Sequence, residues 1–276
     1  MPDTVIPQDA TGDSVTTEPP SVTARAVTAQ GLHKRFGETV AVDGIDLTVP
    51  RGSTFGVVGP NGAGKTTFLR CATGLLRPDA GAVTVEGSDV WRDPVAARRL
   101  VGVLPEDLQL FERLTGAQLL SYTGELFGLP RGEAARRAGE LLELLDLTAD
   151  ARTLVVDYSQ GMRKKVGLAA ALIHSPSVLF LDEPFESIDP VSGRTIRMLL
   201  RRHAEAGGTV ILSSHVMELV EHLCDHVAVI HRGRVVAAGL TEEVAGGQPL
   251  HDAFAHLVEA DTDSEVSLSW LRPSRG

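Results

Sequence analysis

The 276-residue chain has few cysteines, little positive charge and no long uninterrupted apolar run. Its two cysteines, Cys71 and Cys224, cannot form a disulfide framework, which suits a reduced cytosolic setting. A formal net charge of −10 does not provide the basic field that general nucleic-acid binding needs, so we expect no nucleic-acid partner. The longest apolar run, 166–181, is interrupted at 174–176 and does not indicate a membrane span. The N-terminus has no basic segment followed by an apolar core, so we expect no signal peptide.

What is present favours one large α/β domain. With 43% apolar residues, the chain can bury a sizeable core. Residues 1–24 are rich in Thr, Pro, Ser and Asp, which predicts a disordered N-terminal tail. We expect the main domain at 25–245, with a helical subdomain at about 107–175, and a short C-terminal helix and tail at 246–276.

A glycine-rich loop is the most informative stretch. It lies between an apolar, β-branched run and a helical pattern, and it consists of Gly59-Pro60-Asn61-Gly62-Ala63-Gly64-Lys65-Thr66-Thr67. Strand, glycine-rich loop and helix form the context of a phosphate-binding loop, whose backbone N–H groups and helix N-terminus surround phosphate. In this pattern Lys65 supplies a charge for the β- and γ-phosphates, and the Thr66 hydroxyl can bind Mg²⁺. The alternative is a chance match in a structural loop.

A second group of candidate residues ends a buried strand predicted within 177–184. The strand ends in Asp182 and Glu183, and buried parallel strands end at the edge of the sheet where α/β sites lie. Asp182 suits a Mg²⁺ ion beside Thr66, and Glu183 can deprotonate an attacking water. His215, just past the next buried strand, could donate a hydrogen bond to a γ-phosphate. The alternatives are acids that simply face solvent and a structural histidine.

The N-terminal part of the domain contains one exposed aromatic candidate. Strand-like runs at 26–32 and 44–49 flank a loop at 34–37. Phe36 in this loop could stack on a nucleotide base or could pack on the core. Further elements are predicted as strands at 82–86, 100–104, 209–214, 227–230 and 234–238 and as helices at 93–99, 191–206 and 250–257.

The segment 114–174 changes to a helical pattern. Two apolar stripes are predicted to be core, one of Leu119, Leu120, Tyr122, Leu126 and Phe127 and the other of Leu141, Leu142, Leu144, Leu145 and Leu147. A further helix begins near Ser159, a suitable N-cap. Three cations in its first turn, at 163–165, oppose the helix dipole. These cations form either a solvated basic turn or a site that binds an anion supplied from elsewhere.

Taken together, these residues resemble the ATP-binding subunit of an ATP-binding cassette (ABC) transporter over about 26–245. Six motifs occur in the family's order: the adenine-stacking aromatic at Phe36, the Walker A loop at 59–67, the signature motif at 158–162, Walker B with its catalytic glutamate at 178–183, the D-loop at 187–189 and the switch histidine at His215. The resemblance implies an α/β P-loop NTPase with a mostly parallel core sheet, an antiparallel β subdomain and a helical insert.

The resemblance also implies an ATPase that uses ATP and Mg²⁺. Two such subunits, in a homodimer or with a related cassette, would close head-to-tail around two ATP molecules. Residues 159–161 of one subunit would then face the γ-phosphate bound by Lys65 of the other, with Asp189 of the D-loop also at the nucleotide. Glu183 would activate the water, and hydrolysis would reopen the dimer. The motion would reach an integral membrane permease, which holds the cytoplasmic chain at the inner face of the cell membrane.

Several residues depart from the family's pattern, among them Phe36, which stands where the family more commonly has Tyr. The signature usually reads Leu-Ser-Gly-Gly-Gln, but here Gln160 replaces the first glycine and Met162 the glutamine. This form resembles the branch that serves drug, antibiotic or polymer exporters. Ser159 and Gly161, the parts that contact phosphate in the family, are present. The Q-loop glutamine is replaced by Glu106, whose carboxylate can still approach Mg²⁺ but adds negative charge near the triphosphate.

We favour a subunit that powers transport, with export favoured over import, through a separate permease. A soluble ABC ATPase acting on ribosomes or nucleic acid is the alternative. However, ribosome-binding members resemble two cassettes in one chain, and the insert here is too short for the coiled-coil or zinc insertions of DNA-repair members. A GTPase switch would need an Asn-Lys-x-Asp guanine motif, which the sequence lacks. The transported substrate cannot be read from this chain, because the membrane subunit contacts it.

Overall fold

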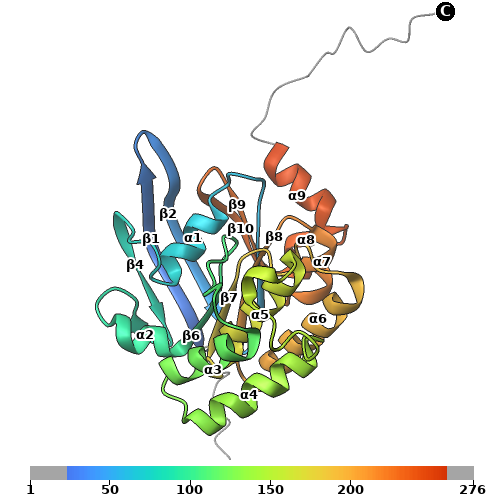
Figure 1. Cartoon of the computed structure of the whole chain (residues 1–276). Helices are drawn as coiled ribbons and strands as arrows, with labels where there is room; N and C mark the ends of the chain where they lie inside the picture. Colours follow the sequence, from blue (N-terminus) through green and yellow to red (C-terminus); the bar gives the residue numbers. More distant parts are fainter. Residues whose placement is uncertain (1–23, 260–276) are drawn as a thin grey trace, which may run out of the picture.

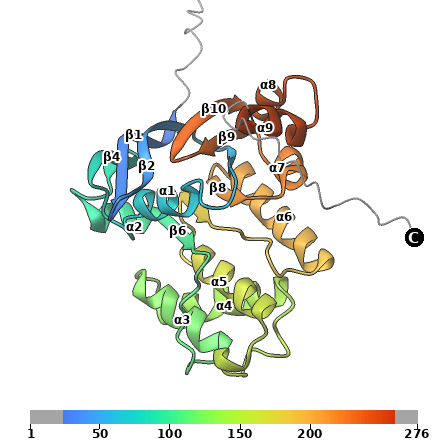
Figure 2. The ribbon, with the colours of Figure 1, turned by 90° about the horizontal axis from the view of Figure 1, so that it is seen from above.

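A computed structural model describes residues 24–259 of the chain as two β-sheets and a group of helices (Figure 1). The disordered tail predicted for residues 1–24 lies, except for residue 24, outside the described residues, as does the end of the predicted C-terminal tail at 260–276. Viewed from above, the antiparallel strands and the C-terminal helices lie on opposite sides of the central strands (Figure 2). The helices α3 (Gly116–Leu126), α4 (Arg131–Leu144) and α5 (Gln160–Leu172) form a separate lobe. The α/β architecture with an antiparallel subdomain and a helical insert is therefore confirmed.

The larger sheet positions the candidate site. Its strand order is β10-β9-β3-β8-β7-β6, in which β10 is antiparallel to β9 and the other neighbours are parallel. The strands are β3 (Thr54–Val58), β6 (Val101–Leu104), β7 (Val178–Leu181), β8 (Thr209–Ser214), β9 (His226–His231) and β10 (Arg234–Leu240). Because the strands are parallel, their carboxyl ends share one edge, and the residues that follow β3, β6, β7 and β8 converge there.

The β7 strand shows why an uninterrupted apolar run was needed. Its four residues are all buried. Leu179 and Leu181 pack into the core on one face of the sheet, and Val178 and Phe180 into the core on the other. A parallel strand covered on both faces requires this composition, as its sequence predicted.

The smaller sheet is antiparallel, in the order β2-β1-β4-β5. Its strands are β1 (Arg25–Phe36), β2 (Thr39–Pro50), β4 (Ala80–Val85) and β5 (Ser88–Asp89). Strand β1 extends to Phe36, into the segment 34–37 that was predicted as a loop, because Lys34, Arg35 and Phe36 continue the pairing with β2 up to the tight turn at Gly37. The short strand β5 was not predicted.

Ten helical segments complete the described chain. They are α1 (Lys65–Ala72), α2 (Pro94–Leu100), α3 (Gly116–Leu126), α4 (Arg131–Leu144), the 3₁₀ turn η1 (Val155–Asp157), α5 (Gln160–Leu172), α6 (Pro190–Glu205), α7 (Met217–Leu223), α8 (Thr241–Ala245) and α9 (Leu250–Glu259). Helices α7 and α8 were not predicted. Leu250 of α9 is fully buried in the same core as Val220 of α7, so α9 packs on the main domain. Within residues 24–259, no helix combines the length and the apolarity needed to cross a membrane.

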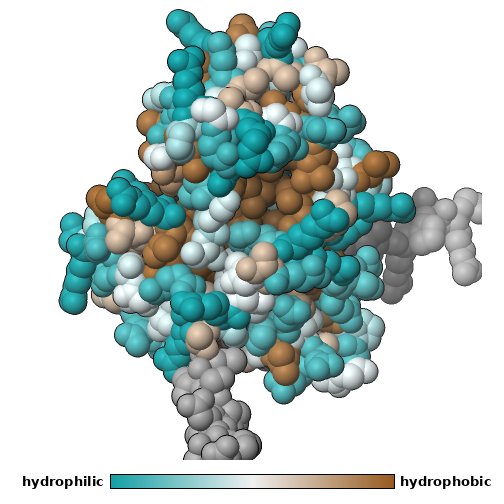
Figure 3. Space-filling model, turned by 90° about the horizontal axis from the view of Figure 1, so that it is seen from below, coloured by the Kyte–Doolittle hydropathy of each residue, from teal (hydrophilic) through white to brown (hydrophobic). Residues whose placement is uncertain are grey.

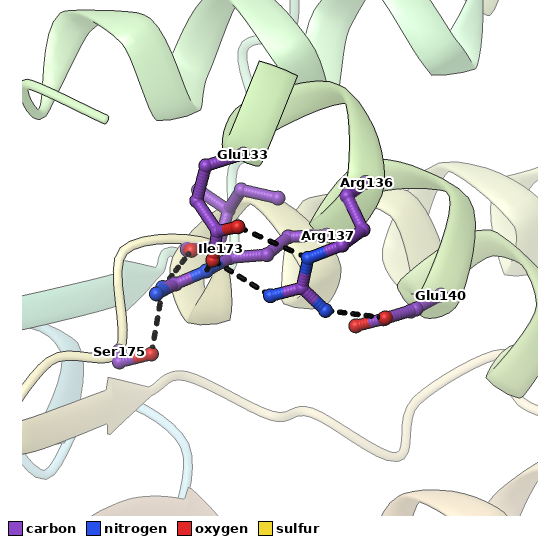
Figure 4. A network of polar contacts seen from close by, with 6 residues as sticks. All are labelled: Glu133, Arg136, Arg137, Glu140, Ile173 and Ser175. Carbon is purple, nitrogen blue, oxygen red and sulfur yellow. Dashed lines mark hydrogen bonds and ion pairs between the residues drawn. The ribbon is translucent and has the colours of Figure 1, made fainter. Parts of the chain in front are cut away.

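The helical insert is joined to the sheet by polar contacts as well as by its core. Arg136 and Arg137 of α4 both bind Glu133, and together with Glu140 they form a charged network on this helix (Figure 4). Arg137 also donates to the Ile173 carbonyl, at 3.0 Å, and to the Ser175 hydroxyl, at 2.9 Å, in the segment between α5 and β7. Hydrogen bonds from Arg136 and Arg137 lower the pKa of Glu133 to about 2.

One of the two stripes predicted to be core is only half buried. All of the second stripe is buried or partly buried. In the first stripe, Leu119 and Leu120 are buried, but Tyr122, Leu126 and Phe127 are exposed. Helical spacing cannot separate an apolar side chain that contacts its own core from one that faces outward for another contact. The prediction of core was therefore wrong for these three residues.

Candidate functional site

The phosphate-binding loop connects β3 to α1 with a backbone that only glycine accepts at two points. Gly64 precedes the first residue of α1 with φ of 107°, and a Cβ there would lie 2.2 Å from the Ala41 carbonyl oxygen. A Cβ at Gly59 would lie 2.2 Å from the Ile230 carbonyl oxygen. The loop is thus packed between the backbones of β2 and β9, and α1 begins directly after it. A tightly packed loop followed by a helix N-terminus is the arrangement that binds a triphosphate.

Lys65 lies inside this loop. The residue is only 7% exposed, and its ammonium donates to the Gly59 carbonyl at 2.7 Å and to the Pro60 carbonyl at 3.2 Å. Burial lowers the pKa of Lys65, and the carboxylates of Glu183 and Asp182 oppose that shift. A desolvated ammonium at a helix N-terminus is a strong partner for a phosphate oxygen.

Two carboxylates and a hydroxyl meet beside the loop. Asp182 follows β7 and is 4% exposed, and burial raises the pKa of its carboxyl group. The Thr66 hydroxyl lies 3.2 Å from Glu106 Oε2, and its side chain also hydrogen-bonds Asp182. Oxygen donors of this kind are what Mg²⁺ prefers, and a site with few protein ligands leaves room for phosphate oxygens and water. The donors present therefore fit a magnesium ion held jointly with a nucleotide.

Ser213 organises the two acids that end β7, and no role was predicted for it. Its hydroxyl donates to Asp182 Oδ1 at 2.5 Å and accepts the backbone N–H of Glu183 at 3.0 Å. Its place on the neighbouring strand β8, one residue beyond the Leu181–Leu212 pair, was the only signal in the sequence. Sequence alone does not show which residue of an adjacent strand faces a given acid.

Glu183 adopts an unusual backbone conformation at the centre of the site. Its φ is 47°, in the left-handed region that residues with a side chain seldom adopt. Its Oε1 lies 3.0 Å from Nδ1 of His215, a side chain that is largely exposed. A carboxylate and an imidazole at this distance, at the edge of the sheet, can take part together in proton transfer. The structure therefore brings Lys65, Thr66, Glu106, Asp182, Glu183 and His215 to the same edge.

The signature residues begin α5 and stand apart from the phosphate loop. Ser159 is the N-cap, accepting the Met162 N–H at 3.3 Å, and Gln160 is exposed. A Cβ on Gly161 would lie 2.9 Å from the Ser187 carbonyl oxygen, so glycine lets the D-loop approach this helix end. Among residues 24–259, no hydrogen bond or ion pair joins 159–161 to the loop at 59–67.

The basic stretch near the start of α5 is not solvated. Lys164 and Lys165 are buried, and their ammonium groups lie 3.4 Å from the Asp182 carbonyl oxygen and 3.5 Å from the Ser192 hydroxyl. Arg163 pairs with Glu112 at 3.0 Å. The solvated reading was therefore wrong, because the same helix that carries the cations also packs on the core.

Two further predicted residues flank the site. Phe36, at the end of β1, is 49% exposed, so it does not pack in the core, and the Lys34 ammonium lies 5.6 Å from its ring centroid. Asp189 caps α6 by accepting the N–H groups of Val191 and Ser192, each at 3.0 Å. Hydrogen bonds from Ser192 hold the pKa of Asp189 below its usual value.

Comparisons with known proteins agree with this geometry. The model of the family described as ABC transporter matches residues 42–186. The chain is 44% identical over 219 residues to the daunorubicin resistance ATP-binding protein DrrA3 of Streptomyces coeruleorubidus, which covers 79% of this chain and 69% of that protein. It is 40% identical over 245 residues to the Nod factor export ATP-binding protein I of Ralstonia nicotianae, covering 89% and 75%.

A solved structure shows the same fold. It is described as the ATP binding subunit of an ABC transporter, and it superposes with a TM-score of 0.80 at 27% identity, covering 84% of this chain and 99% of that one. The action on ribosomes or nucleic acid considered above is not favoured by these similarities. The family match covers more than half of the chain, and the loop, the paired acids and the histidine converge at one edge of the sheet. This chain belongs to the ABC transporter family, as an ATP-binding subunit with the ABC ATPase fold and ATPase activity.

Proposed function

We propose that this ATPase subunit powers export through a separate membrane permease, and that two copies, or this chain and a related cassette, bind ATP between them. The observation that carries the proposal is the convergence of Lys65, Thr66, Asp182 and Glu183 at one edge, while the signature residues lie elsewhere on the chain. One chain thus holds each half of a nucleotide site, but the two halves are not in contact.

Binding is assigned to the loop and its neighbours. The backbone N–H groups of 59–67 and the Lys65 ammonium bind the phosphates, and the exposed ring of Phe36 stacks on adenine. Thr66, Asp182 and Glu106 would hold Mg²⁺, and the ion would supply positive charge next to the phosphates. In the partner's site, 159–161 and Asp189 contact the nucleotide from the opposite side.

Hydrolysis is assigned to Glu183 and His215. The Glu183 carboxylate accepts a proton from the attacking water, and its peptide N–H stays bound to Ser213. His215, 3.0 Å from that carboxylate, is placed to donate a hydrogen bond to the γ-phosphate. Lys65 stabilises the negative charge of the transferred group.

The permease is proposed to dock in a groove on the helical lobe that carries exposed aromatic rings. Phe111 and Tyr122 contact each other edge-to-face, at 5.6 Å between ring centroids, and they line a cavity of about 1050 Å³. Phe111 is 57% exposed, although a phenylalanine usually packs inside. On the lower face of the molecule, apolar side chains gather in a hollow between the lobes (Figure 3). The permease would thereby hold the chain at the cytoplasmic face of the membrane.

The direction of transport and the class of cargo rest on the relatives. The relatives named above serve daunorubicin resistance and Nod factor export, and the Tyr-Ser-x-Gly-Met signature resembles that branch. Other relatives are named for methionine import, so the direction needs its own test. Efflux measured in vesicles that contain the permease supports export, and uptake in the opposite sense overturns it.

The first test of the mechanism is ATP turnover of the purified chain beside Glu183→Gln. We expect the wild type to hydrolyse ATP and the variant to lose at least about a hundredfold in rate, because its amide cannot accept the proton. The variant should migrate as a dimer on gel filtration in Mg²⁺ and ATP. Glu186→Gln makes the same chemical change at an exposed carboxylate in the same segment and serves as the control. Unaltered turnover in Glu183→Gln contradicts the assignment.

A further inference from the structure

Lys164 is a buried cation without a buried counter-charge at ion-pair distance. It lies on the second turn of α5, is 7% exposed, and forms no ion pair within the part of the chain that the structure describes. Its ammonium instead donates a long hydrogen bond, 3.4 Å, to the backbone carbonyl of Asp182. Burying an ammonium group is unfavourable unless it is paired or hydrogen-bonded, so this position needs an explanation.

The peptide that Lys164 contacts is the one that joins the two acids of the site. Its carbonyl belongs to Asp182 and accepts from Lys164, and its N–H belongs to Glu183 and donates to Ser213 at 3.0 Å. Immediately after this peptide, Glu183 takes its left-handed φ of 47°. Such a conformation persists only where the surroundings fix it, and here both polar ends of the peptide are fixed.

We propose that Lys164 is a positioning residue for Glu183. Lys164 binds the peptide between Asp182 and Glu183, so the orientation of the Glu183 carboxylate depends on the position of α5. Ser159, which caps α5, begins the same helix five residues earlier. Contact of this helix end with the partner's nucleotide would therefore be transmitted, through one turn of helix and one side chain, to the chain's own Glu183. The inference rests on the proposed two-subunit mechanism and adds a link between the two sites.

Lys165 provides a matched comparison on the same helix. It is equally buried, but its ammonium reaches the Ser192 hydroxyl on α6, not the peptide between the acids. Lys164→Met and Lys165→Met each remove one buried ammonium and keep the length of the side chain. Any loss of stability caused by replacing a buried lysine should be similar in the two variants. Misplacement of the Glu183 carboxylate should occur only in Lys164→Met.

The decisive experiment measures ATP turnover, ATP-dependent dimerisation and the Kd for Mg·ATP. We expect Lys164→Met to lower kcat about tenfold or more, since a small misplacement of a reacting group has effects of this size. Its Kd should change less than about twofold, and it should accumulate the ATP-bound dimer. Lys164→Arg should recover part of the rate. In a Glu183→Gln background, Lys164→Met should cause no further loss of rate, because it acts only through Glu183.

Several results would overturn the inference. One is a Lys164→Met protein that turns over like the wild type. Another is equal loss in Lys165→Met, which would indicate a structural role. A third is a further loss of rate in the Glu183→Gln background. If Lys164→Met does not fold, Ser213→Ala tests the same peptide from its other end, and a normal kcat there excludes the mechanism. A wild type that neither hydrolyses ATP nor dimerises refutes the proposed function itself, and the inference with it.

Discussion

At the scale of single residues, the site is built from side chains that bind backbone as much as they bind each other. Ser213 holds both a carboxylate and a peptide N–H, and Lys65 donates to two carbonyl groups of its own loop. Such bonds fix groups in place before a substrate arrives, and preorganised polar groups in a site of low dielectric are the largest contributors to many enzymatic rates. The unusual φ of Glu183 is tolerated in that setting.

The first residue-scale prediction concerns the charge at Glu106. Its carboxylate lies 3.2 Å from the Thr66 hydroxyl and raises the pKa of the neighbouring Asp182 carboxyl group, although burial is the larger cause of that shift. Glu106→Gln removes one negative charge from the proposed metal ligands. We expect weaker binding of Mn²⁺ to the nucleotide-free chain and tighter binding of metal-free ATP, each by about 1 kcal/mol, or roughly fivefold.

Calorimetric titration of the chain with Mn²⁺ alone, and with ATP in the presence of a chelator, measures both effects. Asp107→Asn is the matched control, since it removes a charge one residue further along the chain at an exposed position. Two affinities that do not move, or that move in the same direction, would show that Glu106 does not act through its charge at this site.

At the scale of helices and strands, the junction between the helical insert and the sheet contains a partly buried titratable group, His174. His174 follows α5, stacks on Phe127 with ring centroids 3.6 Å apart, and places Nε2 3.1 Å from the Val101 carbonyl oxygen at the start of β6. Burial lowers the pKa of His174 to about 4, and the charge of Arg137 adds to the shift. The neutral imidazole is therefore the form that fits between the insert and the sheet.

The element-scale prediction follows from the sign of that shift. Between about pH 6.5 and pH 4, an unfolded chain protonates His174 while the folded chain keeps it neutral. The free energy of unfolding should thus fall as the pH falls through this window, by at most about 3 kcal/mol from this residue. Urea unfolding of the wild type and of His174→Gln at pH 7 and pH 5 measures the effect. An equal loss of stability in both proteins would contradict it.

The same scale shows what the sequence could predict and what it could not. The strand β7 and the helix α6 were predictable, because an apolar run and a capped helix with proline at its first residue are local signals. Helices α7 and α8 are short, with seven and five residues, and neither begins with a side-chain N-cap. Helix α2 is as short as α7 but was predictable, because Asp93 caps it and proline is its first residue. The burial of Lys164 was missed for a different reason: its ammonium contacts the end of β7, an element that the local pattern of α5 does not record.

The candidate site shows the same division. The loop at 59–67 and the acids Asp182 and Glu183 were found because glycine spacing and the end of an apolar strand can be recognised within a short stretch of sequence. Ser213 was missed because its importance comes from register: it lies on β8, beside the end of β7. The burial of the lysines on α5 depends on how that helix packs between the core and the D-loop, which no local pattern records.

At the scale of the whole molecule, we expect the groove around Phe111 and Tyr122 to affect binding to the membrane permease but not the rate of ATP hydrolysis. The double variant Phe111→Ser, Tyr122→Ser removes two exposed rings on the helical lobe. We expect it to keep the wild-type ATP turnover within about twofold in isolation, because neither ring contacts the phosphate loop or the acids. Its binding to vesicles that contain the permease should fall at least about tenfold, since aromatic side chains carry much of an interface's energy.

Leu75→Ser is the control for this experiment, because Leu75 is similarly exposed but lies just beyond the end of α1, outside the groove. Co-sedimentation with permease-containing vesicles, and with vesicles of the same lipids without permease, separates the partner from the bilayer. Equal binding of the double variant and the wild type would place the permease elsewhere.

The packing of the phosphate loop has a consequence for how this protein tolerates mutation. The atoms that would meet a Cβ at Gly59 and Gly64 are the carbonyl oxygens of Ile230 and Ala41, which every amino acid carries. The side chain at position 41 can therefore change during evolution without reshaping the loop, whereas the side chain at 230 is held by the core and the two glycines cannot be exchanged. In a library of all single substitutions selected for ATP-dependent growth, the two glycines should be intolerant, and position 41, whose side chain is partly exposed, should accept many replacements.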